Sequence, residues 1–555
     1  MIIDGRRGVD IGATRLPSSG ATTCLAVVLA LFVTVVGIFW GTRVAAGSDA
    51  YGYVSQVDLW LRGDLHIDQG FGASVPWPLA RWTFLPLGYR PEPDGFRIVP
   101  QYPPGLPLLM AGAKLIAGQC AMFWVVPICG GLLVVATYAI GRRLQRPAVG
   151  LAAAWIVATS PTVLFMAIAP MSDVPAASAW AVAIACLVGE TRRSAIGGGA
   201  AAAAAILIRP NLAPIAAVLA MWIWWRASRR GSSEGLRHAS SRFQFRHALA
   251  FAIPASAAAI AIAAINWRLY GSPIQTGYDL TEGFELSYVW PNLQHYVSWL
   301  VFAETPLALA GLVCLFVPAA AIWSTPQARR ARPLFAGCAA VVWTIYLLYV
   351  PWDAWWYLRF FLPLWPLTSI GTVSLVATLD RSSSFTWRRM AIAAVVIALG
   401  VQGLVEAVRR ETFNAARGEA KYVEVARVVE SLTRPDDVIV AAQHSGSLRY
   451  YAGRLTLRWD VGDPAWFDRT VEWLAAHGHH PYFVLEPREV QELRARYGPS
   501  NALARLDWPP LVTFRGGNVV MYDAVNRNRS GAPTEQAELR AVHECPEQRA
   551  APRLR

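Results

Sequence analysis

The stretch Ala21 to Thr42, ATTCLAVVLALFVTVVGIFWGT, decides the fold class of this chain. It contains no charged residue, and it is long enough for one membrane span, which takes roughly 20 apolar residues as a helix. It is too long for a cleaved secretory signal and lacks a small-residue cleavage site, so we interpret it as a membrane anchor. The rest of the chain must then be assigned to the bilayer or to one of its two surfaces.

Apolar runs of similar length recur along most of the sequence. They lie at residues 21–42, 121–141, 147–168, 174–190, 194–208, 210–225, 248–266, 304–323, 334–350, 358–378 and 390–408. The chain is 55% hydrophobic and only 16% charged, with a mean hydropathy of +0.34. These observations predict an α-helical polytopic membrane protein with about eleven transmembrane helices.

The basic residues indicate how these spans are oriented. The net charge is +13, but the basic residues form no single patch with interleaved aromatics, so nucleic acid is not expected as a partner. They occupy every second gap between the predicted spans, as the positive-inside rule requires. The clusters are Arg6, Arg7, Arg15; Arg142, Arg143, Arg146; Arg192, Arg193; Arg226, Arg229, Arg230, Arg237, Arg242, Arg246; Arg329, Arg330, Arg332; and Arg381, Arg388, Arg389. We expect a multi-pass protein of the bacterial cytoplasmic membrane, with residues 1–20 in the cytoplasm.

The same counting assigns residues 43–120 to one large external loop. The segment from Pro104 to Gly118 is apolar, but it is only about fifteen residues long and contains Lys114, so it is shorter than a typical span. If it crossed the membrane, every later arginine cluster would move to the outer side. We therefore expect a juxtamembrane helix at residues 104–118, lying along the outer surface.

The composition changes after the last predicted span. Residues 21–410 form the predicted transmembrane domain, and residues 411–525 read as a small external α/β domain. Its expected strands lie at 438–442, 482–485 and 519–522, and its expected helices at 464–476 and 487–496. Residues 526–555 are rich in Pro, Arg, Glu and Ala without apolar periodicity, so we expect a disordered tail.

The seven cysteines have no C-x-x-C pair. Five of them lie inside apolar runs, Cys120 borders one, and Cys545 is in the tail. This distribution is typical of small apolar filler, so we predict neither disulfides nor a zinc site.

Asp49 follows the first span at the head of the external loop. Ser48 or Asp49 could cap a helix that begins at Ala50, with Tyr51 and Tyr53 in the aromatic belt of the membrane interface. A carboxylate at a helix N-terminus stays ionised, and an ionised carboxylate is what a general base needs. The two roles are compatible, and Asp49 is our candidate catalytic residue.

Other polar residues lie at the same predicted membrane edge. Tyr102, Pro103 and Pro104 close the first loop, where a proline pair also suits an extended entry into a helix. Asp173 places a second carboxylate in the next external turn, where a helix cap is the simpler interpretation.

Two arginines stand at the outer ends of spans, against the positive-inside pattern. Arg359 follows a run of aromatics that includes Trp356, and Arg209 lies in another outer turn. A guanidinium offers a bidentate grip on phosphate. For both arginines, snorkelling towards lipid headgroups explains the same position.

Taken together, these residues resemble a known family. The segments concerned are Ser48-Asp49, Tyr102-Pro103-Pro104, Asp173, Arg359-Phe360-Phe361-Leu362-Pro363, and Gly271-Ser272-Pro273 followed by Thr276-Gly277-Tyr278. They are similar to the GT-C membrane glycosyltransferases of the protein-mannosyltransferase and aminoarabinose-transferase type, and more closely to their bacterial family 39, RgtA-like members. The resemblance covers roughly residues 20–410.

The resemblance implies an activity and a set of site residues. The expected reaction moves a sugar from a polyprenyl-phosphate carrier to a lipid, polysaccharide or protein acceptor at the external membrane face, with inversion and with Asp49 as base. A phosphate leaves already charged, so one carboxylate and one or two arginines suffice, whereas glycoside hydrolases need two carboxylates. The expected substrate-binding residues are Tyr51, Tyr102, Pro103, Pro104, Asp173, Arg209, Tyr278, Trp356 and Arg359. No cofactor is expected.

A metal site and a second contact site remain open. Asp64, His66 and Asp68 would share one face of an extended strand and could hold a divalent metal, although a solvated strand face explains the same alternation. The segment Gln443 to Ser447 could bind an acceptor, although strand-turn-helix connections use the same residue types.

Two other classes of protein fit the same composition. One is a polytopic transporter or flippase of a lipid-linked or small solute. Transporters usually carry ionisable groups or broken helices near the midplane, whereas the predicted spans here carry almost no charge at their centres. The other is a lipid-binding scaffold, in which Asp49 would be only a helix cap. The gathering of candidate groups at one outer edge favours an interfacial enzyme.

Overall fold

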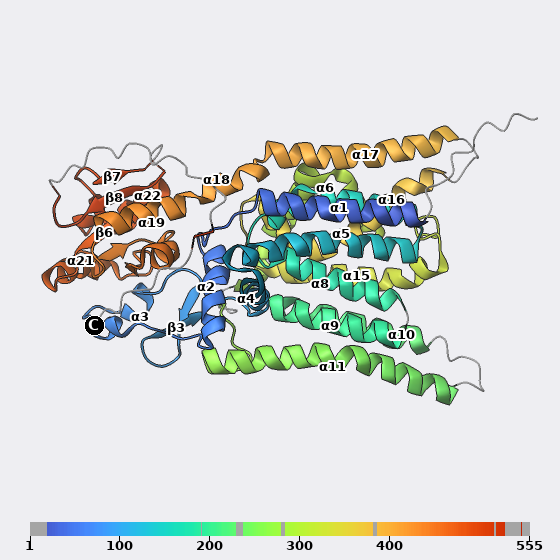
Figure 1. Ribbon diagram of the computed structural model, residues 1–555, viewed down its shortest axis with the longest axis horizontal. Coiled ribbons are helices and arrows are strands. Elements are labelled where there is room, and N and C mark those ends of the chain that lie inside the picture. Colours follow the sequence, from blue (N-terminus) through green and yellow to red (C-terminus); the bar gives the residue numbers. More distant parts are fainter. Residues whose placement is uncertain are drawn as a thin grey trace, which may run out of the picture.

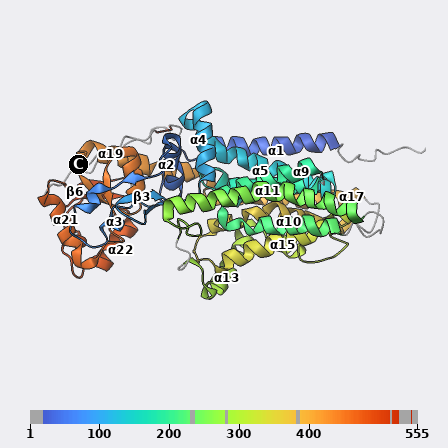
Figure 2. The ribbon, with the colours of Figure 1, turned by 90° about the horizontal axis from the view of Figure 1, so that it is seen from below.

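The computed structural model describes residues 19–189, 191–228, 237–278, 283–380, 386–514, 518–527 and 545–546. A bundle of long helices forms one part of the molecule, and a smaller head with strands and short helices sits at one end of it (Figure 1). Figure 2 shows the same two parts along the same long axis. Residues 1–18 of the predicted cytoplasmic segment 1–20 and most of the predicted disordered tail 526–555 lie outside the described residues, and α1 begins at Ser19.

The main helices of the bundle run along its long axis (Figure 1). They are α1 (Ser19–Phe39), α5 (Val125–Leu144), α6 (Pro147–Thr159), α7 (Pro161–Ala167), α8 (Asp173–Val188), α9 (Arg192–Ile208), α10 (Pro214–Ser228), α11 (Arg237–Tyr270), α15 (Pro326–Leu348), α16 (Trp365–Val376) and α17 (Thr386–Arg409). Shorter pieces are α13 (Val289–Trp299), η6 (Leu300–Glu304), α14 (Pro306–Cys314) and η7 (Trp355–Leu364). The predicted polytopic helical architecture is confirmed.

The number of long spans is lower than the prediction of about eleven. Within the described residues, six helical stretches are long and apolar enough to cross a membrane, and two bent pairs raise this number to eight. The runs predicted at 174–190, 194–208 and 210–225 are helices of 16, 17 and 15 residues, shorter than a typical span. Their lengths, rather than their composition, account for the difference.

Two helices of the first loop cross the end of the bundle instead of running along it (Figures 1 and 2). They are α2 (Asp49–Arg62) and α4 (Gly105–Ala117), joined by an ion pair of 2.6 Å between Asp58 and Lys114. Helix α4 occupies the segment predicted as a juxtamembrane helix, and its Leu115 and Ile116 side chains are exposed. Between the two helices lies a three-stranded antiparallel sheet of order β1-β3-β2. Its strands are β1 (Ile67–Asp68), β2 (Tyr89–Pro91) and β3 (Arg97–Pro100).

The head also contains the predicted α/β domain. A five-stranded sheet has the order β5-β4-β6-β8-β7, with β4 parallel to β5 and β6 and the other pairs antiparallel. The strands are β4 (Val438–Val440), β5 (Leu455–Leu457), β6 (Pro481–Leu485), β7 (Val512–Thr513) and β8 (Val520–Asp523), and the main helices are α19 (Lys421–Leu432), α21 (Phe467–Ala476) and α22 (Pro487–Tyr497). The short strands β5 and β7 were not among the predicted elements.

The first loop and the α/β domain share one hydrophobic core. Trp77 and Phe84 of the loop are buried among the apolar side chains of the domain, and the Trp77 ring packs edge to face on Trp473 at 5.6 Å. Arg449 of the domain donates hydrogen bonds to the Gln69 side chain at 2.9 Å and to the Phe84 carbonyl at 2.6 Å. The two segments are more than 300 residues apart in sequence, yet they form one packed head.

The prediction that the cysteines form no disulfide is wrong. Cys120 and Cys545 are bonded to each other, with a Cα to Cα distance of 5.4 Å. The adjacent Pro546 carbonyl accepts a hydrogen bond from the Gln119 side chain. Most of the tail predicted to be disordered lies outside the described residues, and Cys545 and Pro546 within it contact Cys120 and Gln119.

Candidate active site

Asp49 stands at the first turn of α2, at the end of the bundle where the loop residues 43–120 lie, called here the loop end. Its Oδ1 accepts a hydrogen bond of 2.5 Å from the Tyr102 hydroxyl, and its Oδ2 accepts one of 3.1 Å from Nη2 of Arg359. Ser48 precedes the helix without a side-chain cap, and its hydroxyl pairs with Tyr102 instead. The Asp49 carboxylate is thus used for tertiary contacts from two distant segments.

A glycine makes the contact between Asp49 and Tyr102 possible. A Cβ atom at Gly52 would lie 2.3 Å from the Tyr102 ring, so only glycine lets the ring lie against α2. The opposite neighbour is Gly88, with φ of +86°, where a Cβ would meet the Ser48 carbonyl at 2.9 Å. The local sequence therefore allows the close approach that brings a loop tyrosine to the catalytic candidate.

Arg359 lies between two carboxylates. Besides Asp49, its Nε is 3.9 Å from Oδ1 of Asp173, and the same Oδ1 is 2.9 Å from Nη2 of Arg209. Asp173 begins α8 and its side chain is fully buried, whereas 34% of the Asp49 side chain is exposed. These four residues form an alternating chain of charges, which we call the loop-end network, and Asp49 is its solvent-accessible end.

Hydroxyl groups hold the deeper half of the loop-end network. The Tyr53 hydroxyl donates to Ser172 Oγ at 2.8 Å, and Arg209 Nε donates to the same oxygen at 3.1 Å. Arg209 also reaches the Tyr346 hydroxyl at 3.3 Å, while the Tyr346 ring stacks on Phe360 at 4.5 Å. The guanidinium positions are therefore fixed by buried partners as well as by charge.

Sequence reasoning missed Tyr53, Ser172 and Tyr346. Two of them carried a usable signal, because Tyr53 is one helical turn from Asp49 and faces the same side of α2, and Ser172 adjoins Asp173. Tyr346 carried none, since it lies in the middle of an apolar run and only tertiary packing brings α15 to Arg209, which follows α9.

Tyr102 is a hydrogen-bond donor rather than a titrating group. Burial and the neighbouring Asp49 charge raise the pKa of Tyr102 well above its ordinary value. Burial likewise raises the pKa of Tyr53. Both hydroxyls remain protonated at neutral pH, so Tyr102 holds Asp49 in one orientation without taking its charge.

The remaining predicted site residues lie at different distances from the loop-end network. The Tyr278 ring contacts Tyr102 edge to face at 5.8 Å, and Pro104 stands at the N-terminus of α4. Pro103 precedes it in the connection from β3. Trp356 is partly exposed and stacks on Phe165. No contact of Trp356 with the four charged residues is found among the described residues.

Tyr51 faces away from the loop-end network. Its ring is buried against Tyr89 and packs so closely on the α/β domain that a Cβ at Gly446 would lie 2.2 Å from it. Burial raises the pKa of Tyr51 to about 12. The segment Gln443 to Ser447 docks here too, since Ser445 Oγ accepts a hydrogen bond from the Leu87 amide at 3.1 Å. Both features hold the domain on the loop.

The candidate metal residues are not gathered into one site. Asp64 contacts one ring nitrogen of His66 at 2.9 Å, but the second ring nitrogen faces Glu92 at 3.6 Å. Asp68 is the last residue of β1. Among the described residues, no group of three or more His, Cys, Asp and Glu side chains is arranged to hold a metal ion.

One family model matches part of the chain. The model of the dolichyl-phosphate-mannose-protein mannosyltransferase family matches residues 101–240, a segment that includes Tyr102, Asp173 and Arg209. A search of the curated proteins found no match to the sequence.

Solved structures show the same fold over most of the chain. ArnT from Cupriavidus metallidurans bound to undecaprenyl phosphate has a TM-score of 0.56 and 13% identity, covering 93% of this chain and 100% of that chain. The archaeal oligosaccharyltransferase AglB from Archaeoglobus fulgidus, in complex with an inhibitory peptide and a dolichol-phosphate, has a TM-score of 0.52 and 13% identity, covering 88% of this chain and 72% of that chain. The chain has the GT-C fold, so the predicted resemblance is confirmed at that level.

Proposed function

We propose that this protein is a membrane glycosyltransferase that moves a sugar from a polyprenyl-phosphate carrier to an acceptor hydroxyl at the external face of the membrane. The observation that carries the proposal is Asp49, a solvent-accessible carboxylate held by Tyr102 and Arg359 at the loop end. The fold supports it, because ArnT and AglB share that fold and are bound to polyprenyl phosphates. Lipid, polysaccharide and protein acceptors all suit this arrangement.

In the proposed reaction, Asp49 accepts the proton of the acceptor hydroxyl as its oxygen attacks the anomeric carbon. The bond from that carbon to the phosphate oxygen breaks, and inversion follows from attack opposite to the leaving group. Arg359 supports the departing phosphate, because a guanidinium has five N–H donors and Asp49 takes only one of them. Arg209 and Asp173 fix the position of Arg359 from below.

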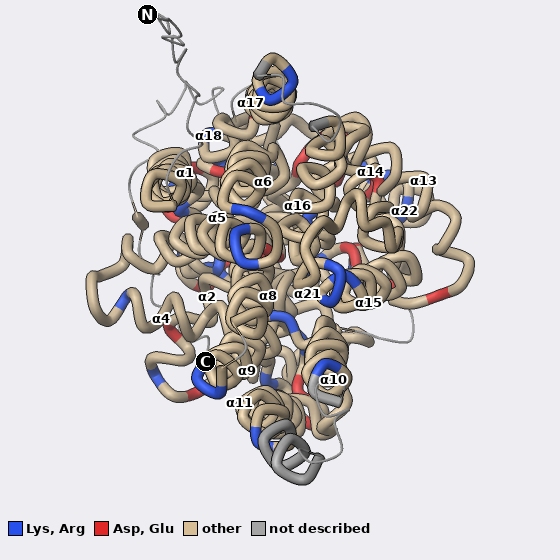
Figure 3. The backbone as a smooth tube through the Cα atoms, turned by 90° about the vertical axis from the view of Figure 1, so that its right-hand side faces the viewer, with Lys and Arg blue, Asp and Glu red and all other residues tan. Residues whose placement is uncertain are grey.

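Two features support an external location for the loop end. Disulfides persist in oxidising compartments, and Cys120 and Cys545 lie beside the loop helix α4 and the head. Basic residues mark the opposite end, which faces the viewer in Figure 3, including Arg142 and Arg143 in the last turn of α5. Labelling of intact cells with a membrane-impermeant maleimide after external reductant should modify Cys545. Labelling that requires permeabilised cells would contradict this orientation.

The decisive experiment is Asp49→Asn in the purified protein, with transfer measured from a synthetic polyprenyl-phosphate sugar. We expect a loss of about 10²-fold to 10⁴-fold at unchanged folding, because the base is lost while its shape is kept. Asp58→Asn is the matched control, since Asp58 lies on the same helix and is also ion-paired. Equal activity of the Asp49→Asn variant and wild type would refute the proposed base.

Identification of the acceptor needs a cellular experiment. In a deletion strain, mass spectrometry of envelope glycans and lipid-linked sugars should show one lost substituent and one accumulated donor. Complementation with Asp49→Asn should leave both changes in place, and complementation with Asp58→Asn should reverse them. A strain with unchanged glycans and donors would contradict the proposed activity.

The transporter or flippase alternative has one observation in its favour. The prediction that the spans carry almost no internal charge misses Glu304, which is buried inside the bundle beside two helix breaks. Uptake of a solute or lipid into vesicles, with no glycosylated product, would favour this class over the proposed enzyme.

A further inference from the structure

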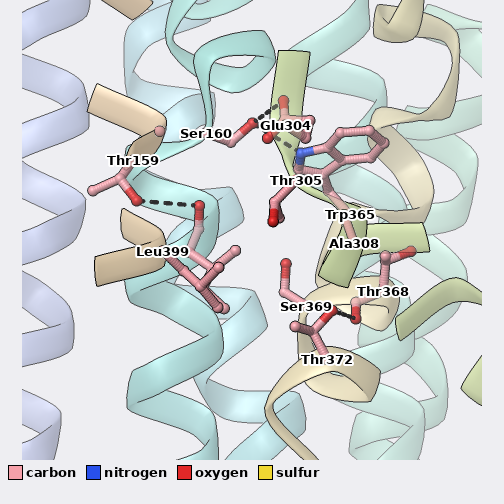
Figure 4. A pocket seen from close by; sticks show the side chains of 12 residues that line it. Thr159, Ser160, Glu304, Thr305, Ala308, Trp365, Thr368, Ser369, Thr372 and Leu399 are labelled. Atoms are coloured by element: carbon pink, nitrogen blue, oxygen red, sulfur yellow. Dashed lines mark hydrogen bonds between the residues drawn. The ribbon is translucent and has the colours of Figure 1, made fainter. Parts of the chain in front are cut away.

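A second polar site lies inside the helix bundle, separate from the loop-end network. Figure 4 shows the pocket, which is lined by Ile156, Thr159, Ser160, Glu304, Thr305, Ala308, Trp365, Thr368, Ser369, Thr372, Leu399 and Gly403. Its free space is ≈ 30 Å³, which suits one or two particles the size of a water molecule. Seven of its lining residues carry a hydroxyl or carboxyl group, an unusual density for the inside of a membrane bundle.

Two broken helices meet at this pocket. Helices α6 and α7 are bent by 60° at Ser160, and the stretch Leu286–Glu304 is bent by 120° from α14 at Thr305. A proline follows each break and begins the next helix, where the missing N–H is tolerated. Breaks of this kind leave backbone and side-chain oxygens free inside a bundle, which is how ion sites are built in many membrane proteins.

The Glu304 carboxylate is satisfied on one side only. Its Oε1 accepts hydrogen bonds from Ser160 Oγ at 2.8 Å, from Thr162 Oγ1 at 2.6 Å and from the Thr162 amide at 3.2 Å. For Oε2 no hydrogen bond to a described residue is found, and Glu304 forms no ion pair with a described residue. The Glu304 residue is only 8% exposed. A buried carboxylate is costly unless a proton or a positive charge compensates it, and the nearest guanidinium, Arg410, acts on Glu304 only from beyond ion-pair distance. This side of the group can therefore take a cation.

Two hydroxyls face the same space. Figure 4 shows the Ser369 and Thr305 hydroxyls pointing towards each other across the pocket. Ser369 is 4% exposed and makes no hydrogen bond with a described residue. Trp365 donates to Ser160 Oγ at 2.9 Å, which leaves Ser160 turned to Glu304 rather than into the pocket. The oxygen atoms that remain available to a ligand are therefore those of Glu304 in η6, Thr305 before α14 and Ser369 in α16.

We propose that the Glu304 pocket binds one monovalent metal cation, with Na⁺ as the probe. A single carboxylate and neutral hydroxyl oxygens match one positive charge, whereas Ca²⁺ takes six to eight oxygen ligands, usually with several carboxylates, and Mg²⁺ retains several waters. The pocket is too small for a hydrated divalent ion. The site does not depend on the proposed transfer reaction, since none of its residues belongs to the loop-end network.

Cation binding would join the two helix breaks. Ser160 and Thr162 belong to the α6–α7 break, while Glu304 and Thr305 belong to the other. Trp365 adjoins the pocket and directly follows η7, which carries Arg359. An ion held here therefore stabilises the packing beneath the loop-end network without contacting it.

The test is binding of ²²Na⁺ to the purified full-length protein in nanodiscs, at constant ionic strength set with choline chloride. We expect saturable binding of about one ion per chain, displaced by unlabelled Na⁺ and not by an equal concentration of Ca²⁺. The Glu304→Gln variant keeps the acceptor at Oε1 and should lose the binding. Asp58→Asn is the matched control, because it removes an ion-paired carboxylate on α2, outside the pocket, and should leave binding unchanged.

A second variant, Ser369→Ala, keeps the proposal testable if Glu304→Gln misfolds. Ser369→Ala removes one neutral oxygen and should weaken Na⁺ binding by about fivefold while the protein keeps its melting behaviour in choline. The wild-type melting temperature should rise with Na⁺, and this rise should be absent in Glu304→Gln. Equal ²²Na⁺ binding by wild type and Glu304→Gln, no binding by either, or displacement by Ca²⁺ would each overturn the proposal.

Discussion

The loop-end network and the Glu304 pocket are both polar sites in an apolar protein, but their charges are balanced differently. At the loop end, two carboxylates alternate with two guanidiniums, so each buried charge has an opposite neighbour within 4 Å. In the pocket, one carboxylate meets only hydroxyl and amide donors. The difference teaches that the loop end is already neutral and organised, whereas the carboxylate in the pocket has no ion pair with a described residue and is influenced by Arg410 only from a distance.

The largest expected effect follows from removing a charge from the balanced site. Asp173→Asn leaves Arg209 and Arg359 buried with one fewer counter-charge, so we expect a loss of about 3 to 5 kcal/mol in the free energy of unfolding. Glu304→Gln, measured without Na⁺, should cost far less, because no paired cation is left behind. Denaturation of both variants in the same nanodiscs checks the comparison, and equal losses would show that the two sites do not differ in charge balance.

The next effect concerns the geometry of the loop-end network rather than its charge. Arg359→Lys keeps the positive charge but loses the fork that reaches Asp49 and Asp173, so transfer should fall about 100-fold. Arg410→Lys is the control, because Arg410 directly follows α17 and pairs with Glu406. Kinetics with a saturating lipid-linked donor measure the loss. Full activity of Arg359→Lys would remove Arg359 from the proposed mechanism.

A smaller effect tests how closely the loop-end network depends on backbone packing. Gly52→Ala places a methyl group against the Tyr102 ring, which should cost about 1 to 3 kcal/mol of stability and reduce transfer. Gly112→Ala in α4 meets nothing within 4 Å and should be neutral or stabilising. Thermal unfolding of the two variants gives the contrast. A neutral Gly52→Ala would mean that Tyr102 does not need to lie against α2.

The smallest expected effect concerns Glu486, a carboxylate of the α/β domain that is nearer to solvent than Asp173 or Glu304. It provides a reference for the two buried sites. Burial acts to raise the pKa of Glu486, but hydrogen bonds from His444 and Lys421 lower it to about 2. Because the unfolded chain has the ordinary value of 4.5, the stabilisation is complete above about pH 4.5 and is lost as pH falls towards 2. We expect wild type to lose about 1 to 2 kcal/mol over this window, allowing for partial exposure.

The variant Glu486→Gln measures that contribution directly. Its stability should be lower than that of wild type at neutral pH and should converge with it at acid pH. The control is Glu492→Gln, whose side chain is half exposed in an i,i+4 pair with Arg488. Parallel pH profiles of wild type and Glu486→Gln would contradict the assigned interaction.

The sequence predicted which residues would matter at the loop end, but not how they contact one another. Asp49, Asp173, Arg209 and Arg359 stood out because each is charged at the edge of an apolar run. Their alternation, and the buried tyrosines that hold it, depends on α2, α8, α9 and η7 converging at one end of the bundle. Contacts over such sequence distances leave no local pattern, so spacing alone could not reveal them.

The same limit explains the two clearest errors. Cys120 and Cys545 are 425 positions apart, and neither neighbourhood resembles a disulfide framework. Glu304 begins the predicted span 304–323 and was not among the predicted site residues. The bent helices place it inside the bundle. In both cases the residue type was visible in the sequence, but the role of the residue depends on a tertiary contact.

The sequence by itself determined the membrane class, the loop that carries Asp49 and the α/β domain, because hydrophobic length and charge bias act locally along the chain. Only the tertiary structure decided which charges neutralise each other and which buried carboxylate, Glu304, has no ion pair with a described residue. Electrostatic pairing depends on distance in space, and in a low-dielectric interior a separation of 4 Å or less outweighs any separation along the sequence.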